Sequence, residues 1–169
     1  KVMPGYRRLI TCMSPSKTFN TAGLMISNIL IREPELRKQW IKGHFDLDNP
    51  LSVAGAEAAY RDGDAWLHAL RSYLDVSFSD MKIEMDKHFA PAHFLIPEGT
   101  YLAWIDLRSY FKTGEDPALF FAEKAGIILE PGEMFVQNGE GFVRMNIARP
   151  RASLMEALTR FRKAIHTRF

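Results

Sequence analysis

Residues 14–24 read SPSKTFNTAGL, and this short stretch decides how the rest of the chain is interpreted. Lys17 stands between small, turn-forming residues, directly after the apolar run LITCM at residues 9–13. Charged residues usually gather on solvated faces, but residues 11–31 contain no other charged side chain. The pattern predicts a buried strand over residues 9–13, followed by a turn that carries Lys17.

The composition is that of an ordinary globular protein. Of 169 residues, 47% are apolar, and 22 Lys and Arg face 20 Asp and Glu. This basic excess is too small for a nucleic-acid-binding or membrane-binding surface. The longest apolar stretch, residues 22–31, is about half the length needed to cross a bilayer. The single cysteine, Cys12, is expected to be a buried, inert thiol. Because one cysteine cannot form an internal disulfide, the sequence fits a reducing, cytoplasmic location.

Alternating strand and helix patterns predict a mixed α/β fold. Proline and acidic residues open a helix at Pro34, and Asn49-Pro50 opens a long helical region. After Gly63, apolar residues recur at helical spacing and are expected to face the core: Trp66, Leu70, Tyr73, Leu74, Met81 and Met85. Further elements are expected as strands at 9–13, 25–31, 93–96, 101–107 and 142–148, and helices at 117–125 and from Pro150, whose apolar face is Leu154, Leu158, Phe161 and Ile165.

Common catalytic motifs are absent from the sequence. The five histidines form neither an HxxxH nor an HExxH spacing, so no metal site is expected. There is no GxSxG elbow for a serine hydrolase, and no glycine-rich loop of the GxxxxGK[ST] or GxGxxG type. Lys17 is therefore the strongest candidate for chemistry.

An amine attacks a carbonyl only when it is unprotonated, and burial away from other charges favours that form. Apolar segments on both sides of Lys17 meet this requirement. Ser14 and Ser16 add hydroxyl groups, and backbone N–H groups at a turn bind phosphate. An amine next to a phosphate-binding turn indicates pyridoxal phosphate as a cofactor. From the residues alone, an ordinary lysine whose amine reaches water is an open alternative.

The segment SPSKTFNTAGL resembles the lysine segment of fold-type I pyridoxal-phosphate enzymes, aminotransferase class I/II. It is most similar to the branch of MalY and PatB, the cystathionine β-lyase-like C–S lyases. The likeness continues in order through nearly the whole chain, in NPLSVAGAEAAYRDGDAWLHAL, IPEGTYLAWIDLR, DPALFFAEKAGIILEPGEMF and GEGFVRMNIARPRASLMEAL.

This resemblance implies roles for particular residues. Lys17 matches the lysine that holds the cofactor and then moves the substrate's α-proton. Ser14 matches a position that contacts the cofactor phosphate, and Ser16 is a weaker candidate. Arg144, in the R-x-N of FVRMN, is similar to the arginine that binds the amino-acid α-carboxylate, a task suited to a planar guanidinium.

Two positions depart from the family pattern. Position 149 is Arg where this branch usually has Cys. Met25 stands eight residues after Lys17, where many aminotransferases have a phosphate-binding arginine. The second departure favours the C–S lyase branch over the aspartate-aminotransferase type.

The family implies a longer protein. Its members are more than twice this length, and most of their cofactor pocket comes from the segment before the lysine. We therefore expect residues 1–62 to be a remnant of the cofactor-binding large domain and 63–169 the small domain. The chain alone is expected to be inactive, and the exposed remnant of a parallel sheet to favour self-association.

Three functions stay open at the level of sequence. The first is a pyridoxal-phosphate C–S β-lyase that cleaves cystathionine or cysteine conjugates. The second is an aminotransferase on the same scaffold, because one fold hosts both reactions. The third is a non-catalytic regulatory or interaction module, which the joint presence of Lys17 and Arg144 disfavours. The family also implies an amino-acid substrate and a homodimer.

Overall fold

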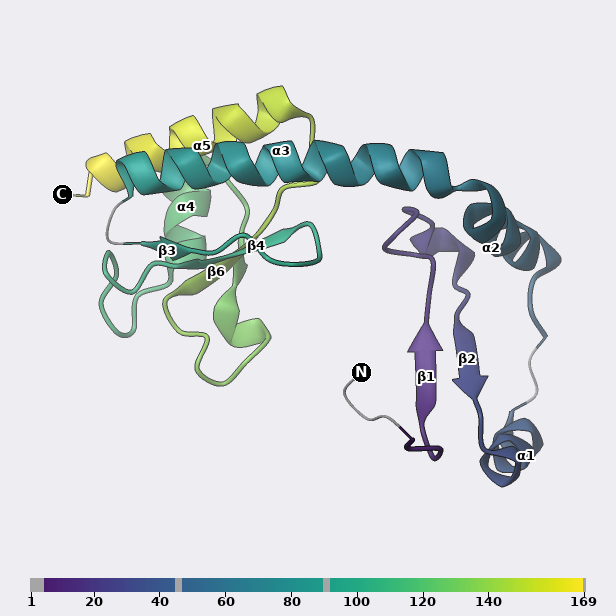
Figure 1. Ribbon diagram of the computed structural model, residues 1–169. Helices are drawn as coiled ribbons and strands as arrows, with labels where there is room; N and C mark the ends of the chain where they lie inside the picture. The colour runs from purple at the N-terminus through teal and green to yellow at the C-terminus, as the bar shows by residue number, and fades with distance from the viewer. Residues whose placement is uncertain (1–4, 45–46, 90–91, 169) are drawn as a thin grey trace. The chain divides into compact units, whose positions relative to one another are not determined.

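The computed structural model describes residues 5–44, 47–89 and 92–168, and it shows helices combined with two small sheets (Figure 1). This confirms the predicted mixed α/β class. The chain divides into two compact units, unit 1 (Lys1–Leu70) and unit 2 (Arg71–Phe169). The predicted boundary after residue 62 falls between two helices, whereas this division falls inside the second of them. Within the described residues, no helix is both long and apolar enough to span a membrane.

Unit 1 is built on a two-stranded antiparallel sheet. β1 (Ile10–Met13) pairs with β2 (Asn28–Ile31), and Ile10 lies opposite Ile31. β1 confirms the first predicted strand, but β2 takes up only the second half of the predicted 25–31 segment. The reason is Met25, whose φ of 51° ends the short 3-10 helix η1 (Ala22–Leu24) in a left-handed conformation. The expected parallel pairing is wrong for these two strands.

The two helices of unit 1 begin where the sequence predicts. Proline occupies the first turn of both α1 (Pro34–Gly43) and α2 (Pro50–Asp62), where its missing N–H is not needed. The side chains of Glu33 and Asn49 accept hydrogen bonds from backbone N–H groups of the first turns. These caps stabilise both helix starts.

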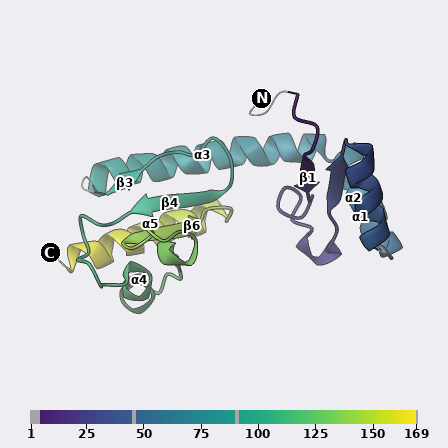
Figure 2. The same ribbon diagram turned by 90° about the horizontal axis from the view of Figure 1, so that it is seen from below.

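Unit 2 is built on a four-stranded sheet in the order β3-β4-β6-β5, in which all neighbours are antiparallel. α5 lies over this sheet (Figures 1 and 2). The elements from the end of unit 1 onward are α3 (Asp64–His88), β3 (His93–Phe94), β4 (Leu102–Asp106), α4 (Pro117–Ala125), β5 (Glu130–Pro131), η2 (Gly132–Met134), β6 (Phe142–Asn146) and α5 (Arg151–His166).

One face of this sheet is buried and the other is partly open. Side chains alternate along β4 and β6, so every second residue points to the same face. The buried face joins α3, α4 and α5 in one core, in which Phe121 stacks on Phe161 with ring centroids 3.8 Å apart. The strand residues of this core are at most 5% exposed and comprise Phe94, Ala103, Ile105, Val143 and Met145.

The predicted apolar face of α5 is confirmed, because Leu154, Leu158, Phe161 and Ile165 are all buried. The stripe predicted on α3 is only half correct. Met81 and Met85 are buried, but Trp66 is 48% and Tyr73 41% exposed. Fully buried residues of α3 begin at Ser77, and before that point the partly buried Leu74 is the predicted stripe residue that packs against the core.

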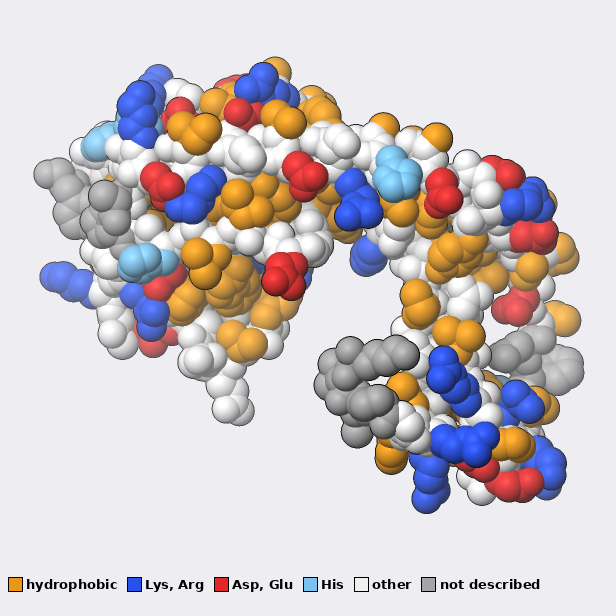
Figure 3. Space-filling view, in the orientation of Figure 1, with side chains coloured by type: hydrophobic (Ala, Val, Ile, Leu, Met, Phe, Trp, Pro, Cys, Tyr) orange, Lys and Arg blue, Asp and Glu red, His pale blue; other side chains and the backbone are white. Residues whose placement is uncertain are grey.

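Cys12 is exposed, which contradicts the predicted buried thiol. The physical reason is that neither face of the β1–β2 sheet is fully covered. Four of its apolar residues are between 37% and 54% exposed: Ile10, Met13, Ile29 and Leu30. Hydrophobic side chains are visible at the surface of both units in Figure 3.

Candidate functional site

Lys17 lies in a tight turn directly after β1, as predicted. The turn is closed by backbone hydrogen bonds from Phe19 N to Pro15 O (2.9 Å) and from Thr21 N to Ser16 O (3.0 Å). Pro15 is buried, but Lys17 is exposed, so the predicted burial of the amine is wrong within the described chain. No hydrogen bond or ion pair involves its side chain among the described residues. The amine is therefore available for a ligand.

The turn is held from one side by aromatic packing. The ring of Phe19 meets Tyr60 edge-on at 5.8 Å and lies 6.0 Å from Trp66. Gly63 permits this approach, because a Cβ atom there would come within 2.5 Å of the Phe19 ring. The end of α2 and the start of α3 thereby fix the position of Phe19, two residues after the amine.

Hydroxyl groups surround the same turn. Ser14 Oγ donates to the backbone oxygen of Ile26 at 2.8 Å and lies 3.0 Å from Ser16 Oγ. Because a hydroxyl has one proton, Ser14 cannot donate to a ligand without giving up one of these contacts. Thr21 Oγ1 is buried and has no hydrogen-bond partner among the described residues. The sequence did not single out Thr21, although it lies in the quoted segment.

Arg144 lies in β6, between β4 and β5, with Trp104 opposite it on one side and Glu130 on the other. Its guanidinium forms a bidentate ion pair with the Glu130 carboxylate. Arg144 Nε donates to Glu130 Oε2 at 2.7 Å, and Nη2 donates to Oε1 at 2.8 Å. Such parallel charge-assisted bonds define the orientation of both groups.

The pair also shifts both ionisation equilibria. The hydrogen bond from Arg144 lowers the pKa of Glu130 below its ordinary value, and partial burial opposes this shift. The same hydrogen bond raises the pKa of Arg144. Both groups are therefore charged at neutral pH, and the pair is an ion pair rather than a neutral contact.

Aromatic rings surround the guanidinium. The Phe135 ring centroid is 3.8 Å from Cζ of Arg144, within cation–π distance. Trp104 meets Phe135 edge-on at 6.0 Å and stacks on Phe142 at 5.6 Å. A second arginine, Arg108, lies over the far ring of this row, 4.6 Å from the centroid of Phe142. The partly open face of the sheet thus carries an aromatic row with an arginine at each end.

The predicted site residues belong to different units. Lys17 and Ser14 lie in unit 1, and Arg144 lies in unit 2. Three neighbours of the arginine were not predicted from the sequence: Glu130, Phe135 and Trp104. A signal for Glu130 exists, because the glycine-rich segment 131–141 joins β5 to β6 as a hairpin that brings residue 130 opposite residue 144.

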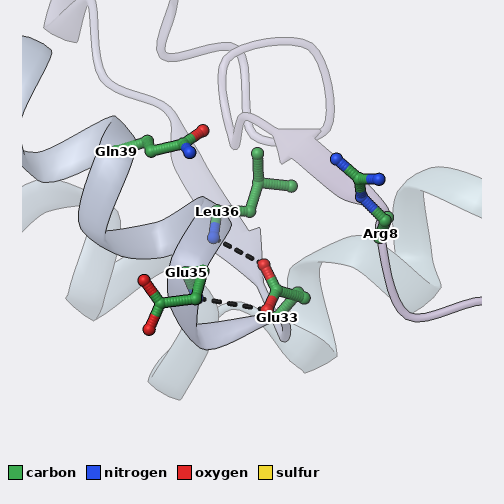
Figure 4. Close-up of a pocket in the computed structure, with 5 residues that line it drawn as sticks. All are labelled: Arg8, Glu33, Glu35, Leu36 and Gln39. Atoms are coloured by element: carbon green, nitrogen blue, oxygen red, sulfur yellow. Dashed lines mark hydrogen bonds between the residues drawn. The ribbon is translucent and has the colours of Figure 1, made fainter.

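A cavity of about 310 Å³ in unit 1 is lined by none of the predicted site residues (Figure 4). It is lined by Arg8, Glu33, Glu35, Leu36 and Gln39, and Glu33 already accepts the hydrogen bonds of the α1 N-terminus there. Within the described residues, no group of three or more His, Cys, Asp or Glu side chains is arranged to hold a metal ion.

A scan against protein-family models finds no match, but individual proteins match over most of the chain. The chain is 30% identical to cystathionine beta-lyase PatB of Bacillus subtilis over 161 residues, which are 92% of this chain and 41% of that protein. It is 34% identical to protein MalY of Escherichia coli over 159 residues, 90% of this chain and 40% of that protein. The chain therefore spans about two fifths of the length of these relatives.

A solved structure agrees with these matches. The PLP-bound C-S lyase from Staphylococcus hominis superposes with a TM-score of 0.92 at 46% identity, covering 96% of this chain and 43% of that one. A more distant match, at 28% identity, is the LL-diaminopimelate aminotransferase of Nitratidesulfovibrio vulgaris. The fold and these relatives define the chain as part of a fold-type I pyridoxal-phosphate enzyme. Within that class, it belongs to the MalY/PatB-type cystathionine β-lyase branch.

Proposed function

We propose that this chain supplies the lysine and the carboxylate-binding arginine of a pyridoxal-phosphate-dependent C–S β-lyase acting on cystathionine or cysteine conjugates. The observation that carries the proposal is the 46% identity to the PLP-bound C-S lyase from Staphylococcus hominis over 96% of this chain. In the reaction, the bond between Cβ and sulfur breaks, water is taken up, and a thiol, pyruvate and ammonia leave.

Lys17 is assigned the proton transfers. Its amine removes the proton from the substrate Cα and then delivers a proton toward the departing sulfur. Its lack of a hydrogen-bond or ion-pair partner in the described chain supports this role, because no internal bond has to be broken before the amine acts. Packing of Phe19 against Tyr60 and Trp66 keeps the turn in place during these transfers.

The residues of this turn fit a phosphate-bearing cofactor. The Lys17 amine is available, and the buried Thr21 hydroxyl lacks a partner among the described residues. Ser14 and Ser16 are assigned to the phosphate, with Ser14 giving up its bond to Ile26 to donate there. When bound, pyridoxal phosphate supplies an electron sink for the negative charge that develops at Cα.

Arg144 is assigned to the substrate α-carboxylate. A guanidinium binds a carboxylate through two parallel hydrogen bonds, which fixes both its position and its orientation. This role of Arg144 favours an amino-acid substrate, because every amino acid carries an α-carboxylate. The side chain of that substrate then determines which thiol leaves.

We further propose that the active protein is longer than this chain, a cytoplasmic homodimer in which residues 1–62 belong to the large domain and 63–169 to the small domain. The share of the relatives that the chain spans supports this, as do the single cysteine and the exposed apolar residues of β1 and β2. The chain by itself is proposed to be inactive.

The second candidate function is amino transfer, supported by the 28% identity to an aminotransferase. In that reaction Lys17 would move the substrate α-proton without expelling a thiol, and the bound cofactor would supply the electron sink and accept the amino group.

The experiment compares both activities in the full-length protein that contains this chain, loaded with pyridoxal phosphate. We expect pyruvate release from cystathionine without an added keto acid, and a loss of about 10²–10⁴-fold in Lys17→Ala. Lys42→Ala, another exposed lysine of unit 1, is the matched control and should keep full activity. Keto-acid-dependent amino transfer without pyruvate release would replace the lyase by the aminotransferase.

A further inference from the structure

The contact between Glu130 and Arg144 carries an inference beyond the assignment of the arginine. We propose that Glu130 is a positioning residue, which holds the Arg144 guanidinium so that its outer edge stays ready for the carboxylate of a substrate. This inference rests on the proposed role of Arg144 and adds a residue that the sequence did not indicate.

Arg144 has more hydrogen-bond donors than Glu130 uses. A guanidinium has five N–H groups: one on Nε and two on each Nη. Glu130 engages Nε and Nη2 at 2.7 and 2.8 Å, which is one side edge of the planar group. Within the described residues, the side chain of Arg144 makes no other hydrogen bond. The edge formed by Nη1 and the second N–H of Nη2 remains for another carboxylate, and a substrate can bind there without displacing Glu130.

The plane of the Arg144 guanidinium is fixed as well. The Phe135 ring lies 3.8 Å from Cζ and Trp104 meets the Phe135 ring edge-on, so the arginine is supported on a face as well as on an edge. Trp104, Arg144 and Glu130 stand opposite one another on three adjacent strands. Orientation of the arginine is therefore set before a ligand arrives, which removes an ordering cost from binding.

The opposite role is physically possible for the same contact. A carboxylate that already neutralises Arg144 competes with a substrate carboxylate and repels it. Positioning and competition predict opposite signs: removing Glu130 weakens carboxylate binding if it positions the arginine and strengthens it if it competes. The exposure of the Arg144 side chain, 27%, leaves room for a ligand beside the pair, which favours positioning.

The test uses the full-length pyridoxal-phosphate holoenzyme and two probes, L-alanine and L-alaninamide, which differ in the carboxylate. Inhibition constants are measured for the parent protein, Glu130→Gln, Glu130→Ala and the matched control Glu133→Gln, an exposed acid that makes no ion pair with Arg144 among the described residues. We expect both Glu130 variants to bind L-alanine about three- to tenfold more weakly, while L-alaninamide stays within about twofold. The control should match the parent for both probes.

Unchanged L-alaninamide binding shows that a variant is folded and loaded, so a selective loss is not a general defect. Unchanged or tighter binding of L-alanine in both Glu130 variants would overturn the proposal. The variant Arg144→Ala separates the role of Arg144 from the role of Glu130. If it keeps the preference for L-alanine over L-alaninamide, the role of Arg144 is wrong; if it alone loses that preference, only the role of Glu130 is wrong.

Discussion

The two units of this chain differ in how far each buries its own apolar residues. In unit 2 the sheet and three helices close one core, and Phe121 and Phe161 are at most 1% exposed. In the described part of unit 1, the buried apolar side chains are Pro15, Ile31 and Ala56, and both strands keep exposed apolar residues. Arg144 thus belongs to a unit with its own hydrophobic core, whereas Lys17 belongs to a unit that leaves much of its apolar surface exposed.

This difference explains why the two proposed functional residues are presented so differently. Arg144 sits in the middle of a sheet, where Glu130 and Phe135 restrain it from two directions. Lys17 sits on a turn whose restraint comes from Phe19, while its own side chain is exposed. A substrate-orienting group benefits from rigidity, and a proton-transferring amine needs access to reacting atoms.

The largest effect is expected from the core of unit 2. Phe121→Ala removes a fully buried ring that stacks on Phe161, and should cost about 3–5 kcal/mol in the free energy of opening of unit 2. Leu119→Ala, on the same helix but 56% exposed, should cost less than about 1 kcal/mol. Hydrogen exchange of the β4 and β6 amides measures both. Equal effects of the two variants would contradict a self-contained core.

The next effect concerns the turn that carries Lys17. Gly63→Ala places a Cβ atom within 2.5 Å of the Phe19 ring and 2.3 Å of the Ala59 oxygen, so one of them must move. We expect a loss of about 1–3 kcal/mol in the local stability of the turn, measured by exchange of the Thr21 amide, which bonds Ser16 O.

The matched control for this variant is Gly43→Ala at the end of α1, where a Cβ atom meets nothing within 4 Å. It should be neutral or stabilise the chain by up to about 1 kcal/mol. If exchange at Thr21 is as slow in Gly63→Ala as in the parent, Phe19 does not anchor the turn.

A smaller contrast is expected at the helix caps. Asp116 caps α4 by accepting hydrogen bonds from the Ala118 and Leu119 amides, and Asp116→Ala should cost about 1 kcal/mol. α4 should stay helical, because four of its residues are buried. Glu33→Ala should instead unravel the first turn of α1, since no described residue of that helix is buried.

Amide exchange in the first turns of α4 and α1 separates these outcomes. Glu123→Ala, an exposed acid within α4, controls for the change of charge and should be nearly neutral. Equal protection of α1 before and after the loss of Glu33 would show that its packing, not its cap, holds the helix.

The sequence allowed prediction of the elements whose limits have local causes. α4 was located correctly because Asp116-Pro117 starts it and Gly126, with φ of 60°, ends it. β1 and the turn after it followed from LITCM and Ser14-Pro15 for the same reason. The local pattern around it also made Lys17 a candidate, whereas Arg144 was assigned only through the resemblance of its segment to the family.

Burial and pairing could not be predicted in the same way, because they depend on residues far apart in the chain. Cys12 and Lys17 were expected to be buried from their apolar neighbours, yet apolar strands are buried only if another layer covers them, and the β1–β2 sheet has none in the described chain. The pairing of Glu130 with Arg144 depends on the register of the β5–β6 hairpin. The sequence indicates this hairpin but does not fix which residues of its two strands lie opposite one another.

The smallest expected effect is the pH dependence of unit 2. Hydrogen bonds from Arg108 lower the pKa of Asp106, and the hydrogen bond from Arg144 lowers that of Glu130. A carboxyl group with a lowered folded-state pKa stabilises the fold above its unfolded value, about 4, and this contribution is lost as the pH falls through the folded-state pKa. Unit 2 should therefore lose stability below about pH 4, in addition to any change in unit 1.

The test is thermal unfolding of the parent protein, Asp106→Asn and Glu130→Gln between about pH 2 and 6. This range extends about two pH units on either side of the unfolded-state pKa. Each variant should be slightly less stable than the parent at pH 6 and indistinguishable from it near pH 2, because protonation has already removed the charge that the substitution removes. Side-chain exposure is 15% for Asp106 and 44% for Glu130, so solvent screens the second pair more and its slope should be the shallower. If the stability of the parent protein does not change over this pH range, the prediction is wrong. The arginines would then stabilise the two carboxylates no more in the folded state than water does in the unfolded state.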